Sequence, residues 1–88
     1  MKYVIMRTSR GIPEFLSVPQ HYGFGQEDTW WSIPFDQFDF RLNTFVTKYL
    51  KISAGLKAAN LRKSDSSIQI ITWSNFLEIA QVYRLMAE

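Results

Sequence analysis

The chain has 88 residues, of which 47% are hydrophobic and 16% aromatic, and its net charge is +2. This length and composition predict one folded domain over residues 1–88 with a thin core, and they exclude a disordered chain. The sequence has no cysteine, which excludes disulfides, thiolate nucleophiles, zinc fingers and iron–sulfur sites within it.

The acidic and basic residues are segregated along the chain. Residues 12–40 carry five acids and no Lys or Arg, whereas residues 41–63 carry six basic residues and no acid. The N-terminus has no basic leader followed by an apolar stretch, and no apolar run approaches the roughly 18 residues of a membrane span. We therefore expect a soluble cytoplasmic protein with no membrane contact.

The first third of the chain predicts a β-hairpin followed by a loop. Residues 2–8 are rich in β-branched and aromatic residues and predict a strand, and the turn chemistry of Gly11 and Pro13 leads to a second strand over residues 14–18. Residues 19–28 contain a proline and two glycines and predict a loop. Residues 29–33 are either a third strand or the end of that loop.

From Phe35 onward the apolar period becomes helical. Apolar residues recur at spacings of three and four, at Phe38, Leu42, Phe45, Tyr49 and Ile52. This pattern predicts an amphipathic helix that ends near Ser53, with Gly55 as its C′ residue and Leu56 folded back against it. The sequence does not decide where this helix begins, and its three candidate N-caps are Asp36, Asp39 and Asn43.

The last third predicts a connector, a strand and a second helix. Residues 56–67 form the connector, with room for one helical turn, and residues 68–72 form a short, central strand. Thr72 or Ser74 then caps a helix that runs to about Ala87. Apolar residues cover more than half of its circumference, which is more than one sheet face can hide.

Together these elements predict an α+β fold. We expect a small antiparallel sheet of three or four strands, in the order ββ(β)αβα, with two helices packed on one face. Alternatively, the second helix forms the shared interface of a homodimer.

No residue pattern indicates catalysis. The sequence has no G-x-S-x-G nucleophile motif with which the single histidine, His21, could form a catalytic triad. His21 is therefore expected on the surface of the loop. Asp36 and Asp39, with Glu27 or Asp28, could offer Mg²⁺ its preferred oxygen ligands, but acids near a helix N-terminus are explained by its dipole. We therefore expect no enzyme activity, no cofactor and no metal.

Aromatic and acidic side chains concentrate in the loop and just after it. Adjacent tryptophans point to opposite faces of a strand, so one of Trp30 and Trp31 is expected on the surface unless both faces are covered. This favours a non-enzymatic module that binds a protein partner, by steric occlusion or by offering its acids to a basic surface. The predicted contact residues are Tyr22, Phe24, Glu27, Asp28, Trp30, Trp31, Asp36 and Asp39.

The basic block gives an alternative function. Clustered cations can neutralise phosphates, which predicts nucleic-acid binding through Arg41, Lys48, Lys51, Lys57, Arg62 and Lys63. The first three are expected on one helix face, which would also be the solvated face of an ordinary amphipathic helix. A third alternative is a metal-independent ribonuclease of the bacterial-toxin kind, in which Arg, Lys and Tyr do the work of histidine.

In size, opening strand, lack of catalytic motifs and high aromatic content, the chain resembles the small orphan proteins of bacteriophages and mobile elements, among them anti-CRISPR proteins. The resemblance covers the chain in general character and includes no shared motif. It implies a viral inhibitor that binds and blocks a host factor.

Overall fold

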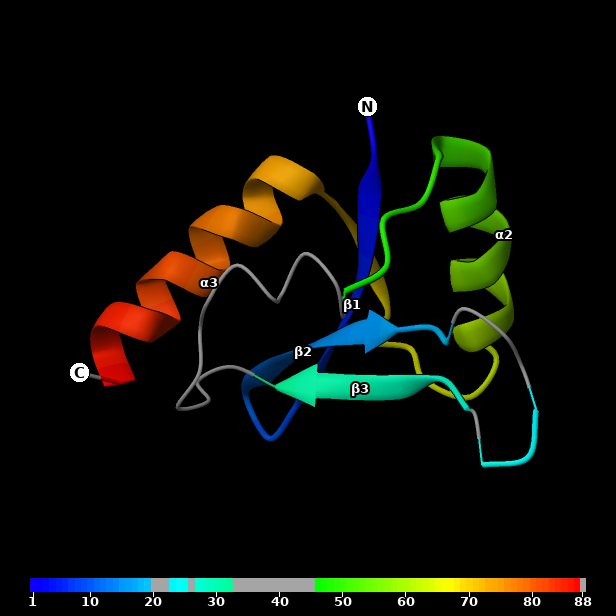
Figure 1. Ribbon diagram of the computed structural model, residues 1–88, viewed down its shortest axis with the longest axis horizontal. Coiled ribbons are helices and arrows are strands. Elements are labelled where there is room, and N and C mark those ends of the chain that lie inside the picture. Colours follow the sequence, from blue (N-terminus) through cyan, green and yellow to red (C-terminus); the bar gives the residue numbers. More distant parts are fainter. Residues whose placement is uncertain (20–22, 26, 33–45, 88) are drawn as a thin grey trace.

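The computed structural model describes residues 1–19, 23–25, 27–32 and 46–87 (Figure 1). Four strands form one antiparallel sheet in the order β3-β2-β1-β4. The elements are β1 (Tyr3–Ser9), β2 (Ile12–Ser17), β3 (Thr29–Ser32), α2 (Lys51–Leu61), β4 (Gln69–Thr72) and α3 (Trp73–Ala87). The predicted α+β class and the predicted order of elements are therefore confirmed.

The β1–β2 hairpin closes through a two-residue turn. Ser9 faces Ile12 across the ladder, and Arg10 and Gly11 between them have φ angles of 54° and 77°. Positive φ at both central positions matches the right-handed twist of paired strands, and glycine adopts it without steric cost. The predicted turn is thus confirmed at Gly11, although Pro13 lies in β2, and the turn fixes the register of the β1–β2 pair.

Strand β1 is buried on both sides. Val4 and Met6 belong to one core cluster, whereas Ile5 between them belongs to another. Successive side chains of a strand point to opposite faces, so this sheet has two covered faces. It must therefore be covered by elements on both sides.

The two helices supply this cover from opposite sides, as Figure 1 shows on either side of β1. Helix α3 brings Phe76 and Ala80 to the face of Val4, and α2 brings Ala58 to the face of Ile5. The prediction placed both helices on one face. The arrangement differs because the three consecutive buried residues of β1 need packing partners in both directions.

The segment before α2 is extended, where the sequence predicted helix. Tyr3 and Tyr49 exchange two backbone hydrogen bonds of 2.7 Å, and the Thr47 N–H donates to the Leu16 carbonyl at 3.2 Å. The predicted helix is therefore wrong over residues 46–50, and its earlier part lies outside the described residues. Helix α2 begins at Lys51 and continues past Gly55, so the predicted C-cap and the predicted connector over residues 56–61 are also wrong.

The last strand and the last helix form where the sequence predicted them, but β4 lies at the edge of the described sheet, beside β1, and the prediction of a central strand is wrong. The Thr72 Oγ1 accepts a hydrogen bond of 3.1 Å from the Asn75 N–H, which makes Thr72 the N-cap of α3. Phe76, one turn into the helix, meets Phe15 edge-to-face with ring centroids 4.8 Å apart, and both side chains are fully buried. Within the described part of the chain, neither helix has the length and apolarity needed to cross a membrane.

Candidate protein-binding surface

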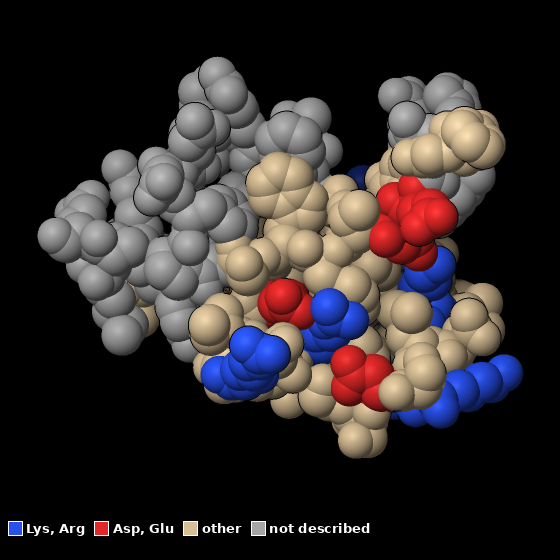
Figure 2. All heavy atoms as spheres, turned by 90° about the horizontal axis from the view of Figure 1, so that it is seen from below, with Lys and Arg blue, Asp and Glu red and all other residues tan. Residues whose placement is uncertain are grey.

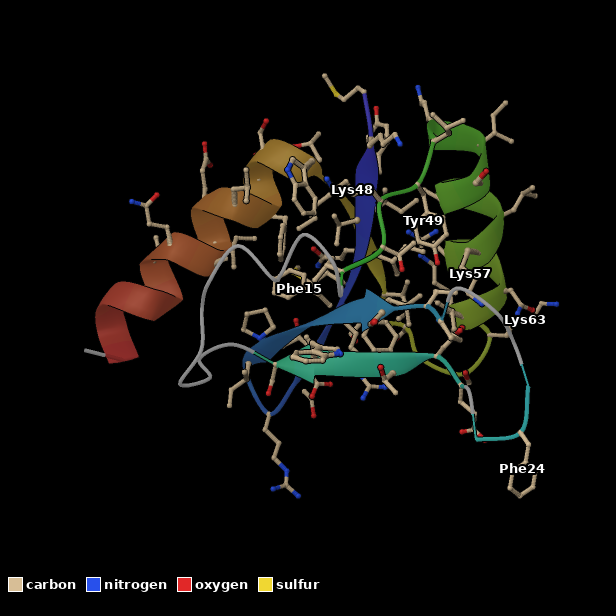
Figure 3. All side chains as sticks on the ribbon, viewed as in Figure 1. Phe15, Phe24, Lys48, Tyr49, Lys57 and Lys63 are labelled. Carbon is tan, nitrogen blue, oxygen red and sulfur yellow. The ribbon has the colours of Figure 1, made fainter. Side chains whose placement is uncertain are left out.

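The predicted loop over residues 19–28, called the aromatic loop below, places the Phe24 ring fully in solvent. Phe24 is as exposed as an isolated residue, and Figure 3 shows its ring pointing away from the body of the protein. Gly25 follows it with a φ of 78°, and Glu27 is exposed. Other predicted contact residues, Tyr22, Asp36 and Asp39, lie outside the described residues, as does His21.

Trp30 and Trp31 point to opposite faces, as predicted, and both are half-buried. Trp30 packs against the Ile5 cluster, and the Arg7 guanidinium lies 4.4 Å from the centre of its ring. Arg7 also donates from Nε to the Glu14 Oε1 at 2.6 Å. Because both sheet faces are covered, neither tryptophan is an open surface residue, and Trp30 belongs to a structural network.

The acidic and basic blocks of the sequence meet in the fold. The Lys57 Nζ on α2 lies 2.7 Å from the Asp28 Oδ2, which joins the base of the aromatic loop to the helix. Figure 2 shows Lys and Arg side chains interspersed with Asp and Glu side chains on the face seen from below. On that face, the described charges therefore form a mixed surface, although they are separated by sign along the chain.

The predicted basic helix face is not formed by the residues that the structure describes. Lys48 lies in the extended segment, with its Nζ 4.2 Å from the centre of the Trp73 ring. Lys51 opens α2, while Arg62 and Lys63 follow its end, and the Arg62 Nε donates to the Ile68 carbonyl at 3.1 Å. Arg41 lies outside the described residues. The basic side chains are thus distributed along and beyond α2.

Helix α2 buries its small residues and exposes its large ones. Ala54 and Ala58 are fully buried against the sheet, whereas Ile52 is 78% and Leu56 is 72% exposed. Ile52, Leu56 and Ala59 follow at spacings of four and three, so they share the outward side of the helix. These three residues, with the 63% exposed Leu50 at the N-terminal end, are called the α2 surface below.

Sequence reasoning missed the α2 surface because it assigned its large residues to buried roles. Ile52 was expected on the buried stripe of an earlier helix, and Leu56 was expected to fold against a C-cap. The sequence does contain a second stripe that indicates the buried side of α2, because Ala54, Ala58 and Leu61 also recur at helical spacings. A stripe dominated by alanine is a weak indication of burial, and only the packed structure distinguishes the two stripes.

A polar turn joins α2 to β4. The Asp65 carboxylate accepts hydrogen bonds from the Ser67 hydroxyl at 2.7 Å and from the Ser67 N–H at 2.9 Å. These two bonds, with a smaller contribution from the charge of Arg7, hold the pKa of Asp65 below its ordinary value. The Ser67 hydroxyl is also 3.3 Å from the Thr8 N–H, which donates to it, so this cluster has a structural role.

The described residues contain no group of three or more His, Cys, Asp or Glu side chains that could hold a metal ion. They do offer exposed aliphatic side chains on one side of α2, with Lys51 and Lys63 near the two ends of that helix. Comparison with known proteins gave no match, whether to a family model, to a curated protein sequence or to a solved structure.

Proposed function

We propose that this chain is a non-enzymatic protein-binding module whose main contact is the α2 surface. The observation that carries the proposal is the reversed burial of α2, with alanines inside and Ile52 and Leu56 outside. An amphipathic helix normally turns its large apolar residues to the core. Grouped aliphatic side chains in solvent are typical of surfaces that bind another protein.

Burial of the α2 surface by a partner would contribute favourably to binding. Full burial of a Leu or Ile side chain contributes about 1.5–3 kcal/mol, and most of that contribution is still unused at Leu50, Ile52 and Leu56. Ordering the partner and losing its freedom of motion offset part of this gain. A few well-packed apolar residues of this kind often carry most of the energy of an interface.

The aromatic loop is a second contact element in this proposal. Phe24 is solvent-exposed, and the Asp28–Lys57 ion pair connects the end of the loop to α2. Figure 3 places Phe24 and the C-terminal end of α2 on the same side of the molecule, to the right of the sheet. A partner seated on α2 and Phe24 would cover this side, which is binding by steric occlusion.

The test compares capture of partners by the wild-type chain and by a variant with a polar α2 surface. The double variant Ile52→Ser/Leu56→Ser should fold normally and lose every partner that depends on this surface. The matched control is Leu77→Ser/Val82→Ser, which changes two exposed apolar residues of α3 and should keep those partners. Equal capture by all three proteins, measured by quantitative mass spectrometry, would contradict the proposal.

No described feature specifically favours nucleic-acid binding over this function. Lys48 and Lys57 already contact Trp73 and Asp28, and no continuous basic helix face is formed by the described residues. Titration into labelled DNA and RNA at about 50 and 200 mM salt separates the two functions, because phosphate binding falls steeply with salt. The role of a phage-type inhibitor stays a prediction.

A further inference from the structure

We infer that the partner segment seated on the α2 surface is amphipathic, with an apolar centre flanked by acidic residues. This inference rests on the proposed function and adds the chemistry of the partner. It combines two observations, the exposed aliphatic side chains and the sign of the charges around them.

Basic residues frame the α2 surface at both ends. Lys51 immediately precedes Ile52, and Lys63 follows Ala59 at helical spacing just beyond the helix. Figure 3 shows Lys63 projecting at the lower end of α2. The helix spans about 16 Å, so two carboxylates about three turns of helix apart could reach the two lysines.

All charged residues within residues 46–63 are basic, and Asp28, which lies outside this stretch, is paired with Lys57 of α2. Among the residues that the structure describes, no ion pair occupies Lys51 or Lys63, in contrast to Lys57, which is paired with Asp28. The first turn of α2 also lacks an acidic residue that would balance the helix dipole. An acidic partner would therefore bring the missing opposite charge.

The same charges argue against a second copy of this chain as the occupant. A twofold interface places the same patch on both sides, so Lys51 and Lys63 of one copy would face lysines of the other. Like charges brought together at an interface disfavour association. The aliphatic strip likewise carries no aromatic side chain for stacking on bases or for anchoring in a lipid headgroup layer.

The first step of the test is a selection from a random-peptide library displayed on a carrier. Peptides are selected on the wild-type chain and counter-selected on the Ile52→Ser/Leu56→Ser variant. We expect the enriched peptides to combine Leu, Ile or Phe at helical spacing with Asp or Glu on either side. Enriched peptides that are basic or uncharged would overturn the inference.

The second step measures one synthesised, labelled peptide by fluorescence anisotropy. The double variant Lys51→Glu/Lys63→Glu, which reverses both charges, should weaken binding of the peptide about tenfold. Exposed ion pairs contribute up to about 1 kcal/mol each, and the reversed charges add repulsion. The matched control, Lys2→Glu/Arg10→Glu, makes the same change in net charge at exposed positions outside α2 and should bind like wild type.

The variants separate the two proposals. If the serine variant loses binding but Lys51→Glu/Lys63→Glu binds like wild type, the protein-binding function stands and the acidic partner is refuted. If the selection yields no peptide that distinguishes the wild-type chain from the serine variant, both are refuted. Sedimentation of the wild-type chain as a dimer that the serine variant abolishes would assign the surface to a second copy instead. Binding to anionic vesicles that needs Ile52 and Leu56 would assign it to a membrane.

Discussion

Substitutions within α2 test which side of this helix is buried, on which both proposals depend. Leu56 keeps 72% of its surface exposed, so little more than a quarter of its burial energy contributes to the fold. Leu56→Ala should therefore lower the free energy of unfolding by about 0.4–0.8 kcal/mol. A buried leucine would lose about 2–5 kcal/mol in the same substitution.

Substitution of leucine for the alanines of α2 tests the same orientation of the helix from its buried side. Ala58 is fully buried, so Ala58→Leu inserts three carbon atoms into a packed core and should cost about 1–3 kcal/mol. Its exposed neighbour Ala59 provides the matched control, since Ala59→Leu makes the same chemical change in solvent and should be nearly neutral. The expected order of stability is thus the reverse of that for an ordinary amphipathic helix.

Urea denaturation followed by circular dichroism measures all three variants. A chain of this length has a free energy of unfolding of about 4–13 kcal/mol, so each expected change is resolvable from the shift of the midpoint. A loss above about 2 kcal/mol in Leu56→Ala, or equal effects of Ala58→Leu and Ala59→Leu, would refute the orientation of α2. The α2 surface would then no longer support a binding function.

Three further predictions concern the hairpin, the core and the polar turn. Gly11→Ala should destabilise the fold by about 1–2 kcal/mol because φ is 77°, whereas Arg10→Asn should stabilise it slightly; equal urea midpoints would contradict this. Phe76→Ala should cost about 3–5 kcal/mol and lower the calorimetric midpoint sharply, and a shift of a few degrees would show that Phe76 is not in the core. Because its folded pKa lies below the ordinary 3.8, the Asp65 carboxylate stabilises the fold above that pH, and this contribution is lost as the pH falls through the lowered pKa. Ser67→Ala should raise the pKa of Asp65 in an NMR titration, and an unchanged value would exclude the Ser67 hydroxyl as a cause.

Local signals in the sequence were sufficient for the hairpin, the last strand and the last helix. Gly11 sets a turn because positive φ is open to glycine, and Thr72 caps α3 because its hydroxyl can accept from a nearby N–H. Each of these effects acts over a few neighbouring residues. The alternation of apolar side chains in turn predicted that Trp30 and Trp31 lie on opposite faces, which the structure confirms.

The separation of acidic and basic residues along the chain gave a misleading prediction of the binding surfaces, because contacts between distant residues leave no local signal. Asp28 and Lys57 belong to separate blocks along the chain, yet the fold pairs them at 2.7 Å. Opposite charges far apart in sequence carry no local signal of contact. The sequence therefore predicted separate acidic and basic surfaces, although Asp28 of the acidic set and Lys57 of the basic set form an ion pair.

The sequence by itself determined the first two strands and the last one, the hairpin turn, a final helix capped at Thr72 or Ser74, and the α+β class, because periodicity and capping are local. Only the tertiary structure decided that residues 46–50 are extended, since Tyr49 exchanges backbone hydrogen bonds with Tyr3, which lies far from it in the sequence. It also decided the orientation of α2. Close approach to the sheet favours small side chains, so the alanines face inward and Ile52 and Leu56 are left in solvent.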